Sequence, residues 1–123
     1  MRALTLVEIG KLSVVEREDP VVEPTEIIIA TIATGICGSD IHGYTGENGR
    51  RFPGQVMGHE LCGLVKEIGA AVHGIDIGTR VVVRPMRSCG DCGYCREGST
   101  HLCSGTLGRS LGYGPPGGFS QQV

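Results

Sequence analysis

Two short segments of the chain carry side chains that bind metals and move protons. The segment Cys37–His42 holds a thiol, a hydroxyl, a carboxylate and an imidazole, and the segment Gly58-His59-Glu60 adds a second imidazole and a second carboxylate. A catalytic zinc typically takes three protein ligands, for example two cysteines and a histidine, and keeps its fourth position open. We therefore predict that the two segments form part of a catalytic zinc site. A lone cysteine such as Cys62 is more often inert core, and we expect that role for it.

A second cluster of cysteines predicts a separate, structural metal site. Cys89, Cys92, Cys95 and Cys103 are separated by two, two and seven residues. Four thiolates around one ion satisfy tetrahedral zinc without an open position. The lobe at about 86–104 has little apolar content, so metal binding rather than burial must hold it together. Disulfides and an iron-sulfur cluster are the alternatives. They are disfavoured because no secretion signal is visible and because the spacing differs from common ferredoxin runs.

Composition predicts a β-rich scaffold for these sites. The chain has 123 residues with 21 glycines, two phenylalanines and no tryptophan, which favours one small barrel over a helix bundle. The strands expected from β-branched and apolar runs lie at 1–8 and 11–17 as a hairpin, then at 26–32, 57–68, 80–84 and 119–123. Between them we expect a short helix capped by Ser39 or Asp40 and a polar loop at 44–53.

Several partner classes are disfavoured by charge and hydropathy. The formal net charge is -2 and the pI is about 6.0, so the basic excess needed for nucleic-acid binding is missing. No apolar run reaches the ~18 residues of a membrane helix, and the N-terminus lacks the pattern of a signal peptide. With six cysteines predicted to be reduced, we expect a cytoplasmic protein.

The three motifs together resemble a known family. Cys37–His42, Gly58-His59-Glu60 and the Cys89–Cys103 lobe are similar to the N-terminal GroES-like domain of zinc-dependent medium-chain alcohol dehydrogenases, including polyol and threonine dehydrogenases. The resemblance covers essentially the whole chain, 1–123. It implies a mainly β fold, a partly open GroES-like barrel with short helices and a zinc-binding lobe. It also implies a parent enzyme that oxidises a small alcohol or polyol by hydride transfer to NAD(P).

The resemblance also implies metal-binding roles for individual residues. Cys37 and His59 would be ligands of the catalytic zinc, and Glu60 would lie under the metal as an exchangeable ligand or as a carboxylate just beyond the ligands. Asp40 would accept a hydrogen bond from the free ring nitrogen of His59 and so orient it. The cysteines of the lobe would hold the structural zinc.

A proton path is implied as well. Ser39 would hand the proton of the alcohol toward His42, whose imidazole suits proton transfer near neutral pH. Without the resemblance, Ser39 and Asp40 would read as ordinary helix-capping residues.

One segment matches a dinucleotide-binding motif, but we do not assign it that function. The segment Gly112–Gly117 matches G-x-G-x-x-G literally, but two prolines occupy it and no helix is predicted after it, so we assign no cofactor-binding residue. In the resembled family a Rossmann NAD(P)-binding domain and usually the third zinc ligand follow beyond Val123. We therefore expect a fragment that is inactive alone, with zinc held firmly by the four cysteines and weakly or not at all at the catalytic site.

A different class of function stays open from the sequence. The chain could act as a freestanding structural zinc-binding or interaction module with a co-chaperonin-like barrel. Such a module would not need Cys37, Ser39 or His59, which favours the dehydrogenase interpretation. Apolar surface that a second domain would otherwise cover predicts self-association into a homo-oligomer.

Overall fold

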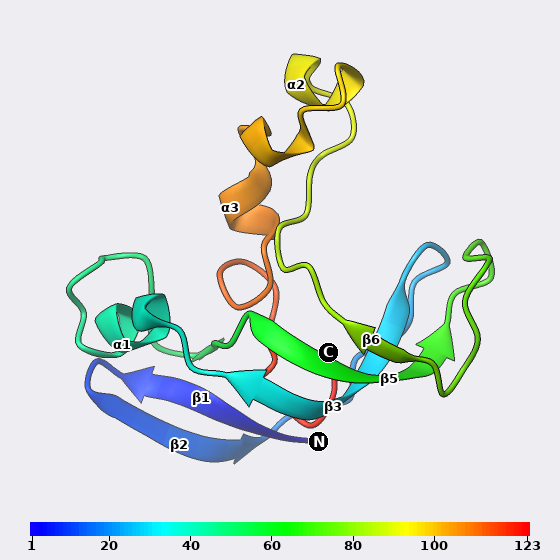
Figure 1. The fold of residues 1–123 in the computed structure, drawn as a ribbon. Helices are drawn as coiled ribbons and strands as arrows, with labels where there is room; N and C mark the ends of the chain where they lie inside the picture. Colours follow the sequence, from blue (N-terminus) through cyan, green and yellow to red (C-terminus); the bar gives the residue numbers. More distant parts are fainter.

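Two small antiparallel sheets and three short helices make up the fold (Figure 1). The structure is a computed structural model, and it describes residues 1–123. The elements in chain order are β1 (Arg2–Glu8), β2 (Lys11–Glu16), β3 (Ile27–Gly35), α1 (Gly38–Tyr44), β4 (Gln55–Val56), β5 (Glu60–Ile68), β6 (Arg80–Val82), α2 (Gly93–Arg96), the 3-10 turn η1 (Thr100–Leu102) and α3 (Thr106–Arg109).

The first sheet has the order β2-β1-β4 and contains the predicted hairpin. β1 and β2 pair antiparallel with Leu4 opposite Val14, and the chain turns at Gly10, whose φ of 78° suits glycine. β4 pairs with the other edge of β1, just beyond the polar loop predicted at 44–53. The hairpin prediction is confirmed.

The second sheet has the order β3-β5-β6, and the limits of all three strands differ from those predicted; β6 ends at Val82, two residues short of the predicted end. β3 runs on to Gly35, three residues past the predicted end, and leaves Ile32 half exposed. β5 begins at Glu60 rather than at Met57, because Gly58 has a φ of 89° that interrupts an extended chain.

The C-terminal segment connects the two sheets in place of the expected last strand. Ser120 forms an isolated bridge with Ala3 of β1, and Gln122 forms one with Ala30 of β3. The amide of Ile29 donates to the carbonyl of Val123, with an N···O distance of 2.7 Å, and Val123 donates back at 3.0 Å. A strand at 119–123 was therefore the wrong description, because the segment divides its hydrogen bonds between two sheets.

The core takes apolar side chains from strands of both sheets. Leu6, Val56, Met57, Leu61 and Val65 are among its most buried side chains. The sheets are joined by bridges rather than by a continuous ladder, which confirms the predicted mainly β, partly open barrel with short helices. Among the helices of the structure, we find none with the length and apolarity needed to span a membrane.

Helix α1 begins one residue after Cys37 and corrects the predicted cap. Cys37 is the N-cap residue, with φ and ψ of -82° and 154°, so neither Ser39 nor Asp40 caps the helix as expected. Asp40 instead lies in the first turn, where its Oδ2 accepts a hydrogen bond of 3.2 Å from the amide of Cys37. Acceptors at this position satisfy a helix amide that has no partner within the helix.

Candidate metal sites

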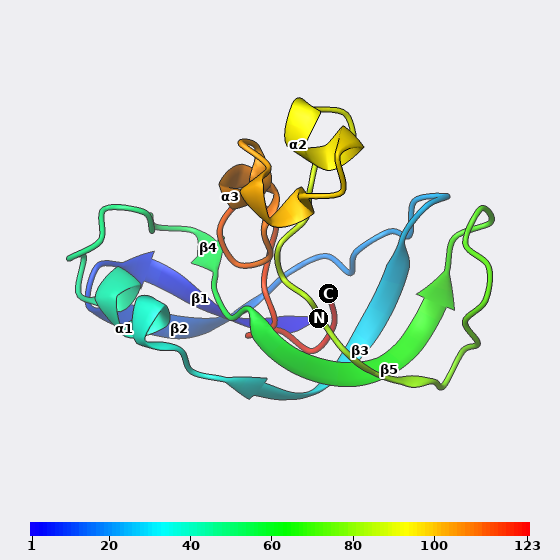
Figure 2. The same ribbon diagram turned by 45° about the horizontal axis from the view of Figure 1, so that its top comes forward.

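The four cysteines converge in a lobe that projects away from the sheets (Figures 1 and 2). The Sγ atoms of Cys92 and Cys95 lie 3.5 Å apart, and those of Cys89 and Cys95 lie 3.8 Å apart. Sulfurs at ~2.3 Å from a tetrahedral zinc lie about 3.8 Å from one another, so these separations fit a metal. A disulfide would need about 2.05 Å, and all six cysteines are free. The donor set and its spacing therefore fit zinc.

Backbone amides around the lobe favour thiolates at two of these cysteines. The amide of Cys89 donates to Sγ of Cys103 at 3.3 Å and lowers the pKa of Cys103 to about 6. The amides of Asp91 and Cys92 lower the pKa of Cys89. Burial raises the pKa of Cys95 to about 11, with a further contribution from its contact with Cys92. A metal ion is therefore needed before Cys95 is deprotonated at neutral pH.

Cys37, His59 and Glu60 form a second group that can hold a metal ion. Their ligand atoms all lie within 4.8 Å of one another. Cys37 ends the connection from β3 to α1, while Glu60 opens β5 opposite Gly35, so the pairing of β3 with β5 brings the two predicted segments together. Cys37 and His59 are partly buried and Glu60 is exposed.

The ring of His59 is held with one nitrogen toward a carboxylate. Its Nδ1 lies 3.5 Å from Oδ1 of Asp40, is buried, and has no partner at ordinary hydrogen-bond length. Its Nε2 lies 3.5 Å from Oγ of Ser39. Asp40 is 2 % exposed. A histidine that faces a carboxylate with one nitrogen and offers the other to a cation is a common zinc-ligand arrangement, so the residues fit the metal.

Ser39 and His42 lie three residues apart on α1, and their side chains contact different partners. Nδ1 of His42 lies 2.7 Å from Oε2 of Glu47, and both side chains are about 60 % exposed. The hydrogen bond with His42 lowers the pKa of Glu47. Ser39 faces His59 on the inner side. Glu47, in the loop after α1, was not singled out from the sequence, where it was one of several polar loop residues.

The glycine-rich segment after α3 packs against the strand entry that carries His59. A Cβ on Gly112 would lie 2.9 Å from the carbonyl oxygen of Gly58, and a Cβ on Gly58 would lie 2.5 Å from the ring of Phe119. The ring of Tyr113 lies 5.7 Å from that of His59, centroid to centroid. The glycines of the G-x-G-x-x-G match thus allow close packing of two backbone segments.

Arg51 joins this packing and was missed as a site residue. It donates to Oδ1 of Asp40 at 3.1 Å and to the carbonyl of Gly112, and its guanidinium lies 3.6 Å from the centre of the Tyr113 ring. In the sequence it sits beside Arg50 in a polar loop, and nothing in that pattern distinguishes the buried arginine from the exposed one.

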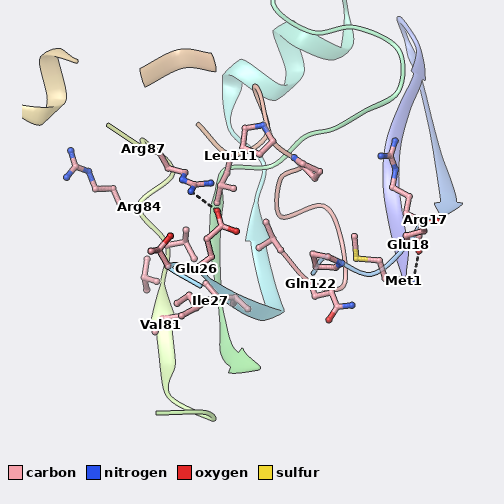
Figure 3. Close-up of a pocket in the computed structure, with 18 residues that line it drawn as sticks. Met1, Arg17, Glu18, Glu26, Ile27, Val81, Arg84, Arg87, Leu111 and Gln122 are labelled. Atoms are coloured by element: carbon pink, nitrogen blue, oxygen red, sulfur yellow. Dashed lines mark hydrogen bonds and ion pairs between the residues drawn. The ribbon is translucent and has the colours of Figure 1, made fainter. Parts of the chain in front are cut away.

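One groove of the structure is lined by none of the candidate ligands of either metal site. It has a volume of about 850 Å³ and runs between β3, β6 and the C-terminal segment, with Ile27 and Val81 among the residues that line it (Figure 3). Arg87 and Glu26 form an ion pair of 2.9 Å at its edge. The candidate ligands Cys37 and His59 are not among its lining residues.

Comparison with known proteins identifies the family. Residues 23–123 match the alcohol dehydrogenase GroES-like domain. The chain belongs to this family. An L-threonine 3-dehydrogenase from Pyrococcus abyssi is 43% identical to the chain over 95 residues, which is 75% of this chain and 27% of that protein. The resemblance inferred from the motifs is thereby confirmed.

Solved structures of alcohol dehydrogenases share the GroES-like fold. RspB from Escherichia coli CFT073, an alcohol dehydrogenase complexed with NADH, is 35% identical with a TM-score of 0.88, covering 100% of this chain and 35% of that one. A thermostable alcohol dehydrogenase from Pyrobaculum aerophilum with cobalt and zinc bound is 31% identical with a TM-score of 0.87, covering 100% of this chain and 38% of that one. The chain thus spans about a third of the length of the relatives it matches.

Proposed function

We propose that this chain supplies the catalytic zinc site and the structural zinc lobe of an NAD(P)-dependent alcohol dehydrogenase. Its substrate would be a small alcohol or polyol, oxidised to a carbonyl compound by hydride transfer. The relatives named as alcohol or threonine dehydrogenases are about three times as long, so cofactor binding would involve residues outside these 123.

One observation carries the proposal. The Sγ of Cys37, a ring nitrogen of His59 and a carboxylate oxygen of Glu60 lie within 4.8 Å of one another, although they come from two separate segments. Zinc bound there would supply Lewis-acid chemistry that lowers the pKa of an alcohol hydroxyl. Cys37 and His59 would be fixed ligands, while Glu60, which is exposed at the start of β5, would be free to approach or leave the ion.

Asp40, Ser39 and His42 would complete the site. Asp40 would hold the Nδ1–H of His59 and leave Nε2 for the ion. Ser39 would accept the proton of the alcohol and pass it toward His42, which lies one helical turn further along α1. His42 is exposed and its Nδ1 is engaged by Glu47, so its Nε2 would be the nitrogen that exchanges the proton with solvent.

The cysteine lobe would hold the second zinc in a structural role. All four ligand positions would be taken by thiolates of Cys89, Cys92, Cys95 and Cys103, which leaves no place for substrate. The lobe contains only short helical turns, so the ion would replace a hydrophobic core there.

An activity assay on the full-length protein that carries this chain tests the proposal. Alcohols and polyols are offered with NAD⁺ or NADP⁺, and reduced cofactor is followed by absorbance. We expect oxidation of at least one substrate, abolished by His59→Ala and slowed by Ser39→Ala by about 10²-fold or more in kcat. His73→Ala, at an exposed histidine in a turn, is the matched control. Activity unchanged by His59→Ala would reject the proposed site.

A further inference from the structure

Arg51 is a positively charged residue whose side chain is completely buried. Its side chain is 0 % exposed, and burial lowers the pKa of its guanidinium. Buried charges require partners, and Arg51 has an ion pair with Asp40, a hydrogen bond to the carbonyl of Gly112 and the face of Tyr113. The neighbouring Arg50 in the same loop is exposed, so the loop does not by itself require Arg51 to be buried. We therefore look for the cause of its burial in the contacts that Arg51 makes.

Asp40 connects Arg51 with both candidate zinc ligands. Its Oδ1 lies 3.1 Å from a terminal nitrogen of Arg51 and 3.5 Å from Nδ1 of His59. Its Oδ2 accepts the amide of Cys37 at 3.2 Å. A single carboxylate therefore touches the ring of one ligand and the backbone of the other. Whatever fixes this carboxylate also fixes the relative position of both ligands.

The geometry points to Arg51 as a positioning residue for the catalytic zinc. We propose that its ion pair keeps the carboxylate of Asp40 turned toward Nδ1 of His59, which favours the tautomer whose Nε2 can bind the ion. This rests on the proposed function, in which Cys37 and His59 hold zinc. Groups that orient zinc ligands typically change metal affinity about 10–100-fold when they are mutated.

The same side chain links the site to the glycine-rich segment. Arg51 holds the carbonyl of Gly112, and a Cβ on Gly112 would lie 2.9 Å from the carbonyl oxygen of Gly58, next to His59. The ring of Tyr113 is in contact with the guanidinium and lies beside His59. Arg51 thus lies between Asp40 and the segment that begins at Gly112, and its proposed effect on His59 runs through Asp40.

Metal titration of variants of the full-length protein that carries this chain tests this role. Zinc affinity at the Cys37–His59 site is measured by competition with a chromophoric chelator, while zinc retained by the four cysteines reports that the lobe is intact. Arg51→Met, which keeps the length of the stem but loses the charge, should bind zinc about 10–100-fold more weakly at this site. Arg51→Lys keeps the charge and should recover most of that loss. Arg50→Met, at the exposed neighbour, should change nothing.

Two further measurements separate positioning from a general structural effect. The tautomer of His59, read from nitrogen-15 shifts of its ring, should be Nδ1–H in the wild type and mixed in Arg51→Met. On an Asp40→Asn background, Arg51→Met should cost no further affinity, since the two residues act through one contact. If Arg51→Met weakens binding as much on that background as alone, the proposed route through Asp40 is wrong.

The variant His59→Ala distinguishes failure of this inference from failure of the proposed function. If His59→Ala binds as much zinc as the wild type, the site itself is not where we place it. If His59→Ala loses one ion while Arg51→Met and Arg51→Lys both bind with wild-type affinity, the site stands and the role of Arg51 is overturned. Should Arg51→Met fail to fold, a wild-type affinity and tautomer in Asp40→Asn would overturn it equally.

Discussion

Oδ1 of Asp40 lies 3.5 Å from Nδ1 of His59, inside the molecule, where the carboxylate is 2 % exposed. A buried carboxylate is costly without partners, and here the partners are a candidate zinc ligand and Arg51. This contact would let Asp40 orient His59 as a candidate metal ligand, and it gives the first prediction.

Asp40→Asn should weaken zinc binding at the Cys37–His59 site by about 10–100-fold. The amide is nearly isosteric but carries no charge, so it no longer selects the Nδ1–H tautomer of His59. The variant also leaves Arg51 as an unpaired buried cation, and we expect the free energy of unfolding to fall by about 3–5 kcal/mol. Zinc competition titration and urea unfolding measure the two effects. Unchanged zinc affinity would show that Asp40 does not orient His59.

Cys103→Ser should remove zinc from the lobe while leaving the sheets folded. Cys103 is the most buried of the four cysteines, and the short turns α2 and η1 have no apolar core to replace the ion. Zinc analysis after dialysis, with amide hydrogen exchange for each residue, measures the change. Protection should be lost at 89–103 and kept in β1 and β5. Retained protection in the lobe of the metal-free variant would contradict a structural role for zinc.

Zinc binding to the lobe should depend on pH in a definite direction. Zinc binds thiolates, and the pKa of Cys95 is raised to about 11, so at pH 7 this thiol is protonated before the metal binds. The pKa of Cys103 is lowered to about 6, so this group contributes little proton release at pH 7 and more below pH 6. Binding therefore releases protons, and the apparent affinity should rise with pH from 6 to 8.

Calorimetry in buffers of different ionisation enthalpy measures this proton release. We expect at least one proton to be released for each zinc bound at pH 7. The variant Cys95→Ser should release fewer protons. A binding constant that is independent of pH between 6 and 8 would contradict the assignment of thiol ligands.

Gly58→Ala should destabilise the protein more than an equivalent change elsewhere. Gly58 has a φ of 89°, and an added Cβ would lie 2.5 Å from the ring of Phe119. Gly74 has a φ of 80° with nothing within 4 Å of an added Cβ, so Gly74→Ala serves as the matched control for backbone strain alone. We expect the free energy of unfolding to fall by about 1–2 kcal/mol in the control and by at least ~1 kcal/mol more in Gly58→Ala. If urea unfolding shows the same loss of unfolding free energy in Gly58→Ala and Gly74→Ala, the packing of Gly58 against Phe119 beside His59 is not tight.

Sequence patterns predicted the elements whose chemistry is local. The hairpin of β1 and β2, the cysteine spacing and the two ligand segments were visible because turn residues and metal ligands recur at short, fixed intervals. The family was recognisable for the same reason. The roles assigned to the site residues stay predictions: Cys37, Ser39, Asp40, His42, His59, Glu60 and the four cysteines of the lobe.

Features that depend on contacts between distant segments could not be read in this way. The burial of Arg51 depends on Gly112 and Tyr113, which lie about sixty residues further along the chain. In the sequence, the segment around Arg51 has only the pattern of a polar loop. The division of the C-terminal hydrogen bonds between β1 and β3 depends on how the two sheets are spaced. The strand entry at Gly58 followed from its positive φ, which the sequence allowed but did not require.

The central claim is that Cys37 and His59 hold a metal ion distinct from the ion of the four cysteines. Cobalt titration followed by visible absorption tests it most directly, because sites with four thiolates and sites with mixed sulfur and nitrogen ligands give different spectra. At saturating cobalt, we predict two ions per chain in the full-length protein that carries these residues, and one in its His59→Ala variant with only the four-thiolate spectrum remaining. Two ions in His59→Ala, or one ion in both proteins, would contradict the claim.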